Sequence, residues 1–547
     1  MQTANLVNQL TQDEFWTLCH DLEKRNDHDT LHELIRVRCA EDVETFAKIF
    51  FPHYCEFPFN QFHRDSFKGY KLGERNYRRA KAAPRGYAKS TTAALFKPIH
   101  DLCYRLESFI VIISNTESQA VQKLKDIQAE LIDNDLLIDV YGRFLKSKKV
   151  GSTDFIAFCG SHALRFVALG SGTEMRGIRF GNVRPSKIIL DDVEHSEKVE
   201  SEELRDKMQR WYQDVVSKIG DGKTNIEVIG TILHRKSLLK YLLKNARYES
   251  KEYKAITSWS SRKDLWKQWA DIYNNIDDEL RDIHAEEFFG LNQIEMMKDV
   301  SVLWPEKESY YSLQIEILES GLRSFMKEKQ NDPLSDEEKV FDINDVWWYQ
   351  ETKDGLLIEK TNKIVPWCDL VPFGAIDPAT GQTKVSGNKK VDYSALINAY
   401  SDSKKRVFIH EDWLRRCSPS IFIRQILEFM QKYNHNKFGV ETNLYRELLL
   451  DNIRDERNRF ESEIGRRMET RFYDIYLTEN KEKRIYTLEP KVKNGHLLFN
   501  RKLSNLLMDQ FWDFPKGEHD DGPDAVEMVF SLVNNRYKVS AVEGLNR

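Results

Sequence analysis

The chain has 547 residues, 41% of them apolar and 31% charged, and a formal net charge of −5. This composition is typical of a soluble globular protein of roughly two to four domains, and no stretch approaches the roughly 18 apolar residues of a membrane span. The first residues have neither the basic start nor the apolar core of a secretory signal. None of the seven cysteines forms a C-x-x-C pair, so we expect a reducing compartment without zinc sites or disulfides.

The N-terminal half predicts a helical segment followed by an α/β domain. Residues 1–50 repeat apolar positions at helical spacing, which indicates two or three helices. Short apolar, β-branched segments then alternate with helical stretches; these segments are 109–114, 163–170, 186–192 and 226–231. Such alternation is typical of a parallel sheet flanked by helices, and we place this domain at 51–250.

A charged region rich in Trp, Lys and Glu separates this domain from a second α/β pattern. Residues 251–345 have mostly helical spacing, and 331–345 has the composition of a connection. The second domain is placed at 346–547. It has strand-like segments at 373–381, 392–402, 406–413, 438–443 and 496–500, and helical segments at 420–433 and 520–535.

Three short basic runs interrupt the acidic background, at 71–81, 146–149 and 481–484. A run of this kind is usually a solvated surface, and we interpret each of them so. The acidic net charge also argues against a protein that grips nucleic acid statically, because such proteins are usually basic.

The segment APRGYAKST, Ala83 to Thr91, nearly matches the phosphate-binding loop G-x-x-x-x-G-K-[ST]. Alanines replace both glycines, but the lysine for phosphate and the serine for Mg²⁺ are present as Lys89 and Ser90. Ala88 is small enough for close backbone approach, at some cost if its φ is positive. Although such a loop also arises by chance, it predicts a nucleotide site built from Gly86, Ala88, Lys89, Ser90 and Thr91.

The surroundings of the loop strengthen this prediction. An apolar strand at 188–190 leads into three acids that suit a Mg²⁺ site, Asp191, Asp192 and Glu194. Strands that end in paired acids also occur at sheet edges and at helix N-caps. Gln61 precedes the loop and offers an adenine contact, and Thr231 ends the next strand where it would sense the γ-phosphate. A surface glutamine and a helix N-cap are the alternatives for these two residues.

The second domain repeats acids at the ends of its elements. Asp377 follows the first strand and Glu441 a later one, while three acids open the last helix, Asp520, Asp521 and Asp524. Paired Mg²⁺ ions about 4 Å apart need carboxylates that converge from several elements, and this order is how ribonuclease-H-like nucleases are laid out. Asp377 also suits a turn before Pro378, and the helix acids suit the helix dipole. Glu441, after an apolar run, is costly to bury unless it is paired or metal-bound.

With both sets of residues in view, the chain from about 50 to 535 resembles the large terminase subunit of tailed double-stranded DNA bacteriophages. These proteins are genome-packaging motors with an N-terminal RecA/P-loop ATPase and a C-terminal ribonuclease-H-like nuclease. Terminases often carry a deviant P-loop with an additional arginine, so the resemblance implies phosphate contacts from Arg85, Lys89 and Ser90. The segment GSGTEMRGIRF supplies Arg176 and Arg179 as candidates for an arginine that acts on a neighbouring subunit's nucleotide.

The resemblance also orders the acids. Many members have Asp-Glu at the end of the acid strand, whereas this chain has Asp191-Asp192 with Glu194 beyond. Asp191 is expected to hold Mg²⁺, and either Asp192 or Glu194 orients the attacking water. In the nuclease, Asp521 and Asp524 lie one helical turn apart and both can face one metal site; we rank Asp521 first.

The function implied is ATP-driven translocation of double-stranded viral DNA into a procapsid, with endonuclease cleavage of the concatemer. The cofactors implied are ATP and Mg²⁺, with Mn²⁺ as an alternative at the nuclease. The partners implied are DNA, a portal protein, a small terminase subunit and further copies of the chain in a ring. We expect this ring to be a pentamer on the procapsid, in the host cytoplasm and away from membranes. The acidic net charge suits a motor that releases DNA at each step.

Two other functions fit part of the sequence. A DNA-repair helicase–nuclease would need a second RecA-like domain, where this chain offers nuclease acids instead. A DNA-binding scaffold with an inactive P-loop would turn over no ATP.

Overall fold

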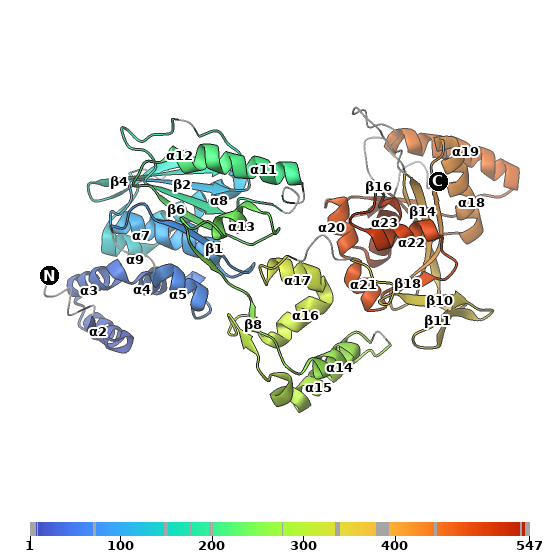
Figure 1. Ribbon diagram of the computed structural model, residues 1–547, viewed down its shortest axis with the longest axis horizontal. Helices are drawn as coiled ribbons and strands as arrows, with labels where there is room; N and C mark the ends of the chain where they lie inside the picture. Colours follow the sequence, from blue (N-terminus) through green and yellow to red (C-terminus); the bar gives the residue numbers. More distant parts are fainter. Residues whose placement is uncertain are drawn as a thin grey trace. The chain divides into compact units, whose positions relative to one another are not determined.

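The computed structural model describes residues 7, 9–68, 73–146, 151–175, 177–195, 199, 201–275, 277–333, 340–378, 393–441, 446–477, 479–536 and 539–541. The chain forms two compact units. Unit 1 comprises Met1–Arg262, Met297–Ile317 and Leu322–Leu334, and unit 2 comprises Lys263–Met296, Leu318–Gly321 and Ser335–Arg547. Residues 251–345 are thus divided between the two units. Figure 1 labels many of the helices and strands described below.

Unit 1 begins with the helices that the spacing predicts, α2 (Gln12–Lys24), α3 (His28–Glu41) and α4 (Val43–Phe50). Each starts at a polar side chain that accepts a hydrogen bond from a first-turn N–H; these caps are Thr11, Asp27 and Asp42. Such caps satisfy N–H groups that have no partner within the helix. The apolar faces of the helices join the core beneath the sheet.

A seven-stranded sheet with the order β3-β4-β2-β5-β6-β1-β7 forms the centre of unit 1. Its strands are β1 (Arg78–Ala82), β2 (Phe109–Ser114), β3 (Asp154–Cys159), β4 (His162–Gly170), β5 (Lys187–Asp191), β6 (Asn225–Gly230) and β7 (Glu249–Glu252). All neighbours are parallel except β3 and β4. The predicted parallel sheet is therefore confirmed, and the order around β1 is that of a RecA/P-loop fold. Because β6 alone separates β1 from β5, the segments after these strands meet at one edge.

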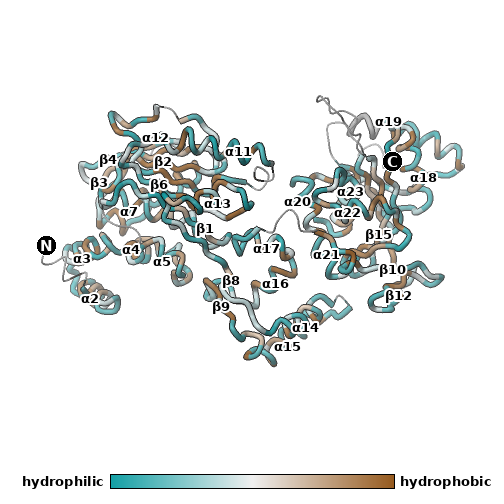
Figure 2. Tube along the Cα trace, viewed as in Figure 1, coloured by the Kyte–Doolittle hydropathy of each residue, from teal (hydrophilic) through white to brown (hydrophobic). Residues whose placement is uncertain are grey.

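Helices cover both faces of this sheet. Strand β2 alternates between them: Ile110 and Ile112 join the core on one face, and Phe109, Val111 and Ile113 the core on the other. Apolar segments concentrate in the strands (Figure 2). The helical elements are α5 (Gln61–Lys68), α6 (Lys89–Thr91), α7 (Lys97–Cys103), α8 (Glu117–Asp133), α9 (Asp135–Tyr141), α11 (Glu202–Trp211), α12 (Ser217–Ile219), α13 (Leu238–Leu243), α16 (Tyr310–Ser320) and α17 (Leu322–Glu328), with π-helical turns at Thr92–Phe96 and Tyr212–Val216. The short strands β8 (Ile256–Ser258) and β9 (Ser301–Val302) pair separately.

The solvated surface predicted for the basic run 71–81 is wrong for its described end. Strand β1 lies between β6 and β7, so Arg79 and Lys81 are only 3% and 5% exposed. Arg79 forms ion pairs with Glu74 at 2.8 Å and Glu249 at 2.9 Å, and Lys81 Nζ donates to the Asp65 carbonyl at 3.0 Å. These buried charges are tolerated because each has an ion-pair or hydrogen-bond partner. Of the run 146–149, all but Lys146 lies outside the described residues.

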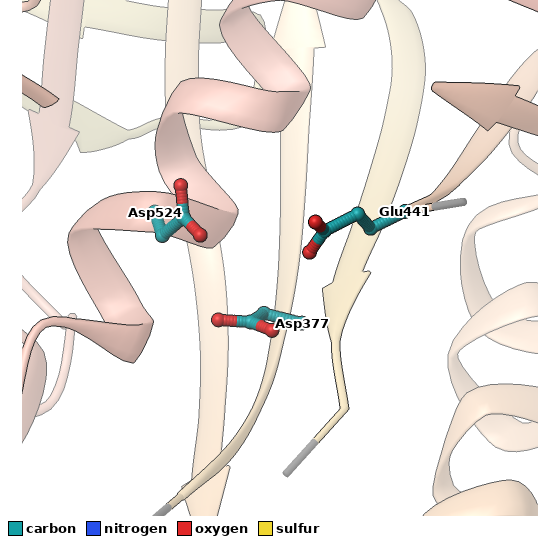
Figure 3. Close-up of side chains that lie close together, drawn as sticks. All are labelled: Asp377, Glu441 and Asp524. Atoms are coloured by element: carbon teal, nitrogen blue, oxygen red, sulfur yellow. The ribbon is translucent and has the colours of Figure 1, made fainter. Parts of the chain in front are cut away.

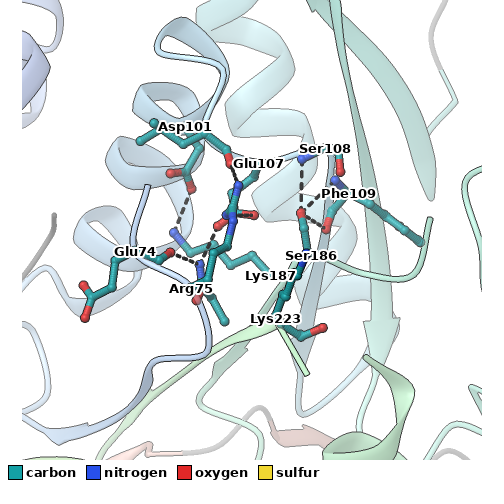
Figure 4. A network of polar contacts seen from close by, with 12 residues as sticks. Glu74, Arg75, Asp101, Glu107, Ser108, Phe109, Ser186, Lys187 and Lys223 are labelled. Atoms are coloured by element: carbon teal, nitrogen blue, oxygen red, sulfur yellow. Dashed lines mark hydrogen bonds and ion pairs between the residues drawn. The ribbon is translucent and has the colours of Figure 1, made fainter. Parts of the chain in front are cut away.

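Buried ion pairs tie helix α7 to two strands of the sheet. Lys97 Nζ lies 2.5 Å from Glu227 on β6, and Asp101, one turn later, lies 2.7 Å from Lys187 on β5. Figure 4 shows the Asp101–Lys187 pair next to the Arg75–Glu107 pair. Helix α7 continues the helical run that begins at Lys89. The two ion pairs therefore fix this run to β5, which ends at Asp191, and to β6, which Thr231 follows.

Unit 2 contains a ten-stranded sheet with the order β12-β11-β10-β18-β15-β14-β13-β16-β17-β19. Its strands are β10 (Trp347–Glu351), β11 (Gly355–Ile358), β12 (Lys363–Pro366), β13 (Val371–Asp377), β14 (Ser394–Ser401), β15 (Val407–Arg415), β16 (Lys437–Glu441), β17 (Phe472–Ile475), β18 (Leu497–Asn500) and β19 (Val539–Ala541). Strands β13 to β15 form an antiparallel meander, and β16 and β17 continue the sheet parallel to β13. The order β15-β14-β13-β16-β17 is that of the ribonuclease-H-like fold that the sequence predicts, and the sheet is extended by β18 and β10 to β12 on one side and by β19 on the other. The sequence analysis did not predict β10 to β12, β17 or β19.

Two helices cover opposite faces of this sheet. Helix α23 (Asp521–Asn534) packs on the face that carries Ala375 and Ile397, and α18 (Pro419–Tyr433) on the face that carries Ile376 and Leu396. Both helices match the predicted segments. The other helices of unit 2 are α14 (Lys263–Tyr273), α15 (Arg281–Met296), α19 (Arg446–Ile464), α20 (Lys481–Tyr486), α21 (Glu489–Lys493) and α22 (Asn505–Asp513). Within the described part of the chain, no helix is both long and apolar enough to span a bilayer.

We expect Lys187→Met to lower the free energy of unfolding of unit 1 by about 3–5 kcal/mol, because it leaves the buried Asp101 carboxylate unpaired. Combining it with Asp101→Leu should recover most of the loss, since a buried ion pair and an apolar pair of similar volume are close in stability. Denaturant-dependent hydrogen exchange of the β5 amides measures this. The control is Lys218→Met, which removes an exposed pair with Asp214. A Lys187→Met variant as stable as the wild type would contradict the prediction.

Candidate functional sites

The loop that joins β1 to α6 contains two residues in the left-handed region, although alanines replace the two glycines of the motif. Gly86 has a φ of +84° and Ala88 a φ of 50°, both in the left-handed region. The strain foreseen for alanine at 88 is therefore present. Helix α6 begins at Lys89, so the N–H groups of its first turn lie at the end of the loop. Ser90 and Thr91, in that turn, are half-buried.

The Lys89 side chain folds back over the loop. Its Nζ donates to the carbonyls of Ala83 and Pro84, each at 3.1 Å, and to Oγ1 of Thr231 at 2.8 Å. Burial is the main cause that lowers the pKa of Lys89 from its usual value. The structure thus brings Lys89 and Thr231 together at the sheet edge, one from the end of β1 and the other from the end of β6.

Three other contacts hold the loop. The Gly86 carbonyl accepts a hydrogen bond from Lys307, and the Arg85 N–H donates to the Glu328 carbonyl at 2.8 Å. His63 Nε2 lies 3.1 Å from the Tyr87 carbonyl, while Asn60 N–H donates to its Nδ1. His63 is a residue that the sequence analysis did not select, because a histidine on a short helix carries no motif.

The side chains of Arg85 and Gln61 point elsewhere. The Arg85 side chain is 76% exposed, with Glu328 at 3.6 Å as its ion-pair partner. Gln61, the predicted adenine contact, lies on the exposed face of α5, where its Nε2 donates to Asp65 at 2.5 Å. The contact of α5 with the loop is made by His63 instead.

The acids after β5 take different positions. Asp191 is fully buried, with Lys123 Nζ of α8 at 2.6 Å. Asp192 has a φ of 46° and accepts a hydrogen bond from the Thr231 N–H at 3.2 Å. Glu194 accepts the N–H groups of Leu238 and Leu239, at 2.7 and 3.1 Å, with its two oxygens. Glu194 therefore caps helix α13. Asp192 contacts the backbone N–H of Thr231, the same residue whose hydroxyl contacts Lys89. Lys123 is a further residue that carries no sequence signal.

The predicted arginines lie on the segment between β4 and β5. Arg176 falls outside the described residues. Arg179 is exposed and lines a cavity of about 430 Å³ with Gly177, Arg184, Asp214 and Lys218.

In unit 2, carboxylates from two strands and a helix converge (Figure 3). Asp377 ends β13, Glu441 ends β16, and Asp524 lies in the first turn of α23. Each offers an oxygen, and these oxygens all lie within 4.8 Å of one another. The parallel pairing of β13 and β16 brings the first two to one edge, and α23 packs across β13 to bring the third.

Two residues of the basic run 481–484 face these acids, so the solvated surface predicted for that run is wrong for Lys481 and Arg484, whereas Lys483 is exposed as predicted. Lys481 Nζ lies 3.2 Å from Asp377, 2.9 Å from Asp520 and 3.2 Å from Asp521. Arg484, one turn later on α20, pairs with Asp524 at 2.9 Å and Glu527 at 3.2 Å. Buried acids recruit the nearest cations, and their spacing of three places both on one face of α20.

The structure groups Asp524, rather than Asp521, with Asp377 and Glu441. Asp521 Oδ2 accepts the Tyr393 N–H at 3.1 Å, and its Oδ1 contacts Lys481. The ranking of Asp521 above Asp524 therefore has no support in this geometry, although both carboxylates belong to the same cluster around Lys481.

The carboxylate trio fits a divalent cation. Oxygen ligands from separate elements are what Mg²⁺ and Mn²⁺ take in proteins. Burial is the main cause that raises the pKa of Asp377 to about 6 and the pKa of Asp524 well above its usual range, with the neighbouring acids adding to the shift. These carboxylates are thus costly to ionise without added positive charge, and a bound cation removes that cost.

No protein-family model matches the chain, and no curated protein matches it in sequence. Among solved structures, the chain is similar to the large terminase of a thermophilic bacteriophage in complex with ADP, with 8% identity and a TM-score of 0.45 over 87% of this chain and 99% of that chain. The large terminase nuclease of the thermophilic phage G20c matches 34% of this chain and 92% of its own, with 12% identity and a TM-score of 0.21. Its zinc-bound form has 13% identity and a TM-score of 0.22. With identities this low, what this chain does has to be argued from its own residues.

The buried His63 predicts a pH dependence. Burial is the main cause that lowers its pKa from 6.5 to about 4. The stability that neutral His63 contributes is therefore fully present above pH 6.5 and is lost as the pH falls towards 4, by about 3 kcal/mol. We expect His63→Phe to lose less stability than the wild type between pH 7 and pH 4, measured by urea unfolding of unit 1. The control is His20→Phe, an exposed site, which should keep the wild-type slope; equal slopes in all three proteins would contradict the assignment.

Proposed function

We propose that the chain is a terminase large subunit, an ATPase and a metal-dependent DNA endonuclease that packages double-stranded viral DNA. The observation that carries the proposal is the presence of two sites in one chain. One is the Lys89 loop beside Asp191 and Asp192 on a RecA-type sheet, and the other is the trio Asp377, Glu441 and Asp524 on a ribonuclease-H-like sheet.

The first site suits phosphoryl transfer to water. The N–H groups at the start of α6 donate to phosphate oxygens. Lys89 leaves the carbonyls of Ala83 and Pro84 and donates to the phosphate oxygens instead. Asp191 and Ser90 are the groups that would hold the Mg²⁺ of the nucleotide, which neutralises charge on the phosphates. Asp192 is the base that positions water, because both oxygens of Glu194 are engaged at α13. Thr231 contacts both Lys89 and Asp192 and so couples the γ-phosphate position to the acid.

The second site suits hydrolysis of a phosphodiester. Asp377, Glu441 and Asp524 are the residues that would hold Mg²⁺ or Mn²⁺, which activates water and stabilises the charge that develops on phosphate. Lys481 and Arg484 fix the acids in place. A repair helicase–nuclease is disfavoured because unit 2 follows the ribonuclease-H-like order where a helicase needs a second RecA-like domain. If the purified chain hydrolyses no ATP, the alternative of a DNA-binding scaffold with an inactive P-loop is supported instead.

This function implies partners, an assembly and a location for the chain. A packaging motor acts on double-stranded DNA in the host cytoplasm, with a portal protein, a small terminase subunit and other copies of the chain in a ring. Arg176 or Arg179 then acts on the nucleotide of the neighbouring copy. The exposed position of Arg179 supports a role between molecules.

We expect Lys89→Ala to abolish ATP hydrolysis and spare divalent-cation-dependent plasmid nicking, and Asp524→Asn to do the reverse, because the two sites lie in separate units. Purified variants assayed for both activities measure this, and melting curves check that each is folded. The control is Lys483→Met, an exposed lysine on α20 that should keep both activities. ATPase activity in Lys89→Ala at the wild-type rate, or nicking by Asp524→Asn, would overturn the corresponding assignment.

Asp192 and Glu194 should differ in a matched pair of amide substitutions. Asp192→Asn removes the proton acceptor beside Thr231, and we expect ATP turnover to fall on the order of 10²-fold or more. Glu194→Gln keeps one acceptor for the α13 N–H groups, so it should lose about 1 kcal/mol of stability and retain turnover. Steady-state ATPase assays and urea unfolding separate these effects. Loss of turnover in Glu194→Gln alone would assign the water to Glu194 instead.

A further inference from the structure

Lys481 sits at the centre of the acid cluster of unit 2. It is the first residue of α20, and Asn480 caps the helix in front of it by accepting the Glu482 N–H. Its Nζ lies within 3.2 Å of Asp377, Asp520 and Asp521, and 3.7 Å from Asp524. An ammonium group has three N–H donors. The surrounding carboxylates therefore offer acceptors for all three donors of Lys481.

Lys481 and the carboxylate trio share two of their acids. Asp377 and Asp524 belong to both sets, whereas Glu441 belongs to the trio and Asp520 and Asp521 to the Lys481 set. Two cation positions therefore lie side by side with carboxylates common to both. This is the arrangement of a two-cation nuclease site, in which shared carboxylates lie between the ions.

Repulsion between neighbouring cations favours one divalent cation beside the ammonium. Two divalent ions repel one another twice as strongly as a divalent ion and a single positive charge at the same distance. Arg484, which is buried and paired with Asp524 and Glu527, adds a fixed positive charge on the same side. A second divalent ion would have to displace Lys481 from its acids and then face Arg484.

We propose that the ammonium of Lys481 occupies the second cation position, so that this site takes one divalent cation per chain instead of two. The inference rests on the proposed nuclease function but concerns only how many cations the acids hold. Lys481 is a positioning residue that keeps Asp377 and Asp524 oriented towards the trio and supplies the second positive charge of the site.

Mn²⁺ binding to the full-length chain tests this, by calorimetric titration together with electron paramagnetic resonance. We expect one Mn²⁺ at the cluster of the wild type, with the spectrum of an isolated ion. A variant with Asp377→Asn and Glu441→Gln gives the number of ions bound elsewhere, and that number is subtracted. Two exchange-coupled Mn²⁺ ions at the wild-type cluster, or none, would overturn the proposal whether or not any variant folds.

Lys481→Met removes the charge and keeps most of the volume. We expect it to bind two coupled Mn²⁺ ions, the first at least about tenfold more tightly than the wild type does, because a repelling charge at close range is gone. Lys481→Arg should keep one ion. The matched control is Lys483→Met on the same helix. The Lys483 side chain is 60% exposed and pairs with Glu479, so this variant should bind Mn²⁺ as the wild type does.

A single ion in Lys481→Met, with wild-type affinity and a wild-type melting curve, would also overturn the proposal. Plasmid nicking separates it from the proposed function. A wild-type chain that nicks DNA and holds two coupled ions keeps the function and loses this inference. A chain that holds one ion but nicks no DNA with any divalent cation keeps the inference and loses the function.

Discussion

The need to neutralise buried carboxylates governs the surroundings of both candidate sites. Each site is built at strand ends, where acids leave a buried strand and remain partly beneath packed helices. An isolated carboxylate in that position costs several kcal/mol, and the cost falls when a cation lies nearby. Lys123 meets Asp191 in unit 1, and Lys481 and Arg484 meet the acids of unit 2. The same rule places Lys187 against Asp101 beneath the first sheet.

This rule connects the fold to the chemistry. A lysine that neutralises a buried acid also marks where positive charge is favourable, which is where a metal ion or a phosphate-bound cation would lie. At Asp191 the position is held by a side chain of α8, and at the unit 2 cluster by a side chain of α20. Binding of nucleotide or divalent cation therefore competes with, or adds to, an ion pair within the protein. These ion pairs organise the acids of each site in advance of binding.

The loop after β1 shows how tertiary contacts compensate for an unfavourable local sequence. Alanine at 88 holds a left-handed conformation that glycine would adopt at less cost. The loop is held from several sides, by His63 of α5, by Lys307, and by the Glu328 carbonyl at the end of α17. These contacts over-determine the backbone, which is the condition for keeping strained residues at a functional site. The absence of glycine at 83 and 88 is thus compatible with a working loop.

Local periodicity in the sequence was enough to predict strands β2, β4, β5, β6, β13 to β16 and β18, the helices α18 and α23, and the residue types at the strand ends. It did not predict β1, β3, β7, β10 to β12, β17 or β19. Strand order confirmed the two α/β folds. The contacts between side chains that lie far apart in the sequence depend on the tertiary fold. It grouped Asp524 with Asp377 and Glu441 and turned Glu194 towards α13. It also buried Arg79, Lys81 and Arg484 and placed Lys481 against the acids of unit 2, although local composition assigned all four cations to the surface. A basic run looks the same in sequence whether it faces water or an acid, since the difference lies in the partner that the fold brings to it.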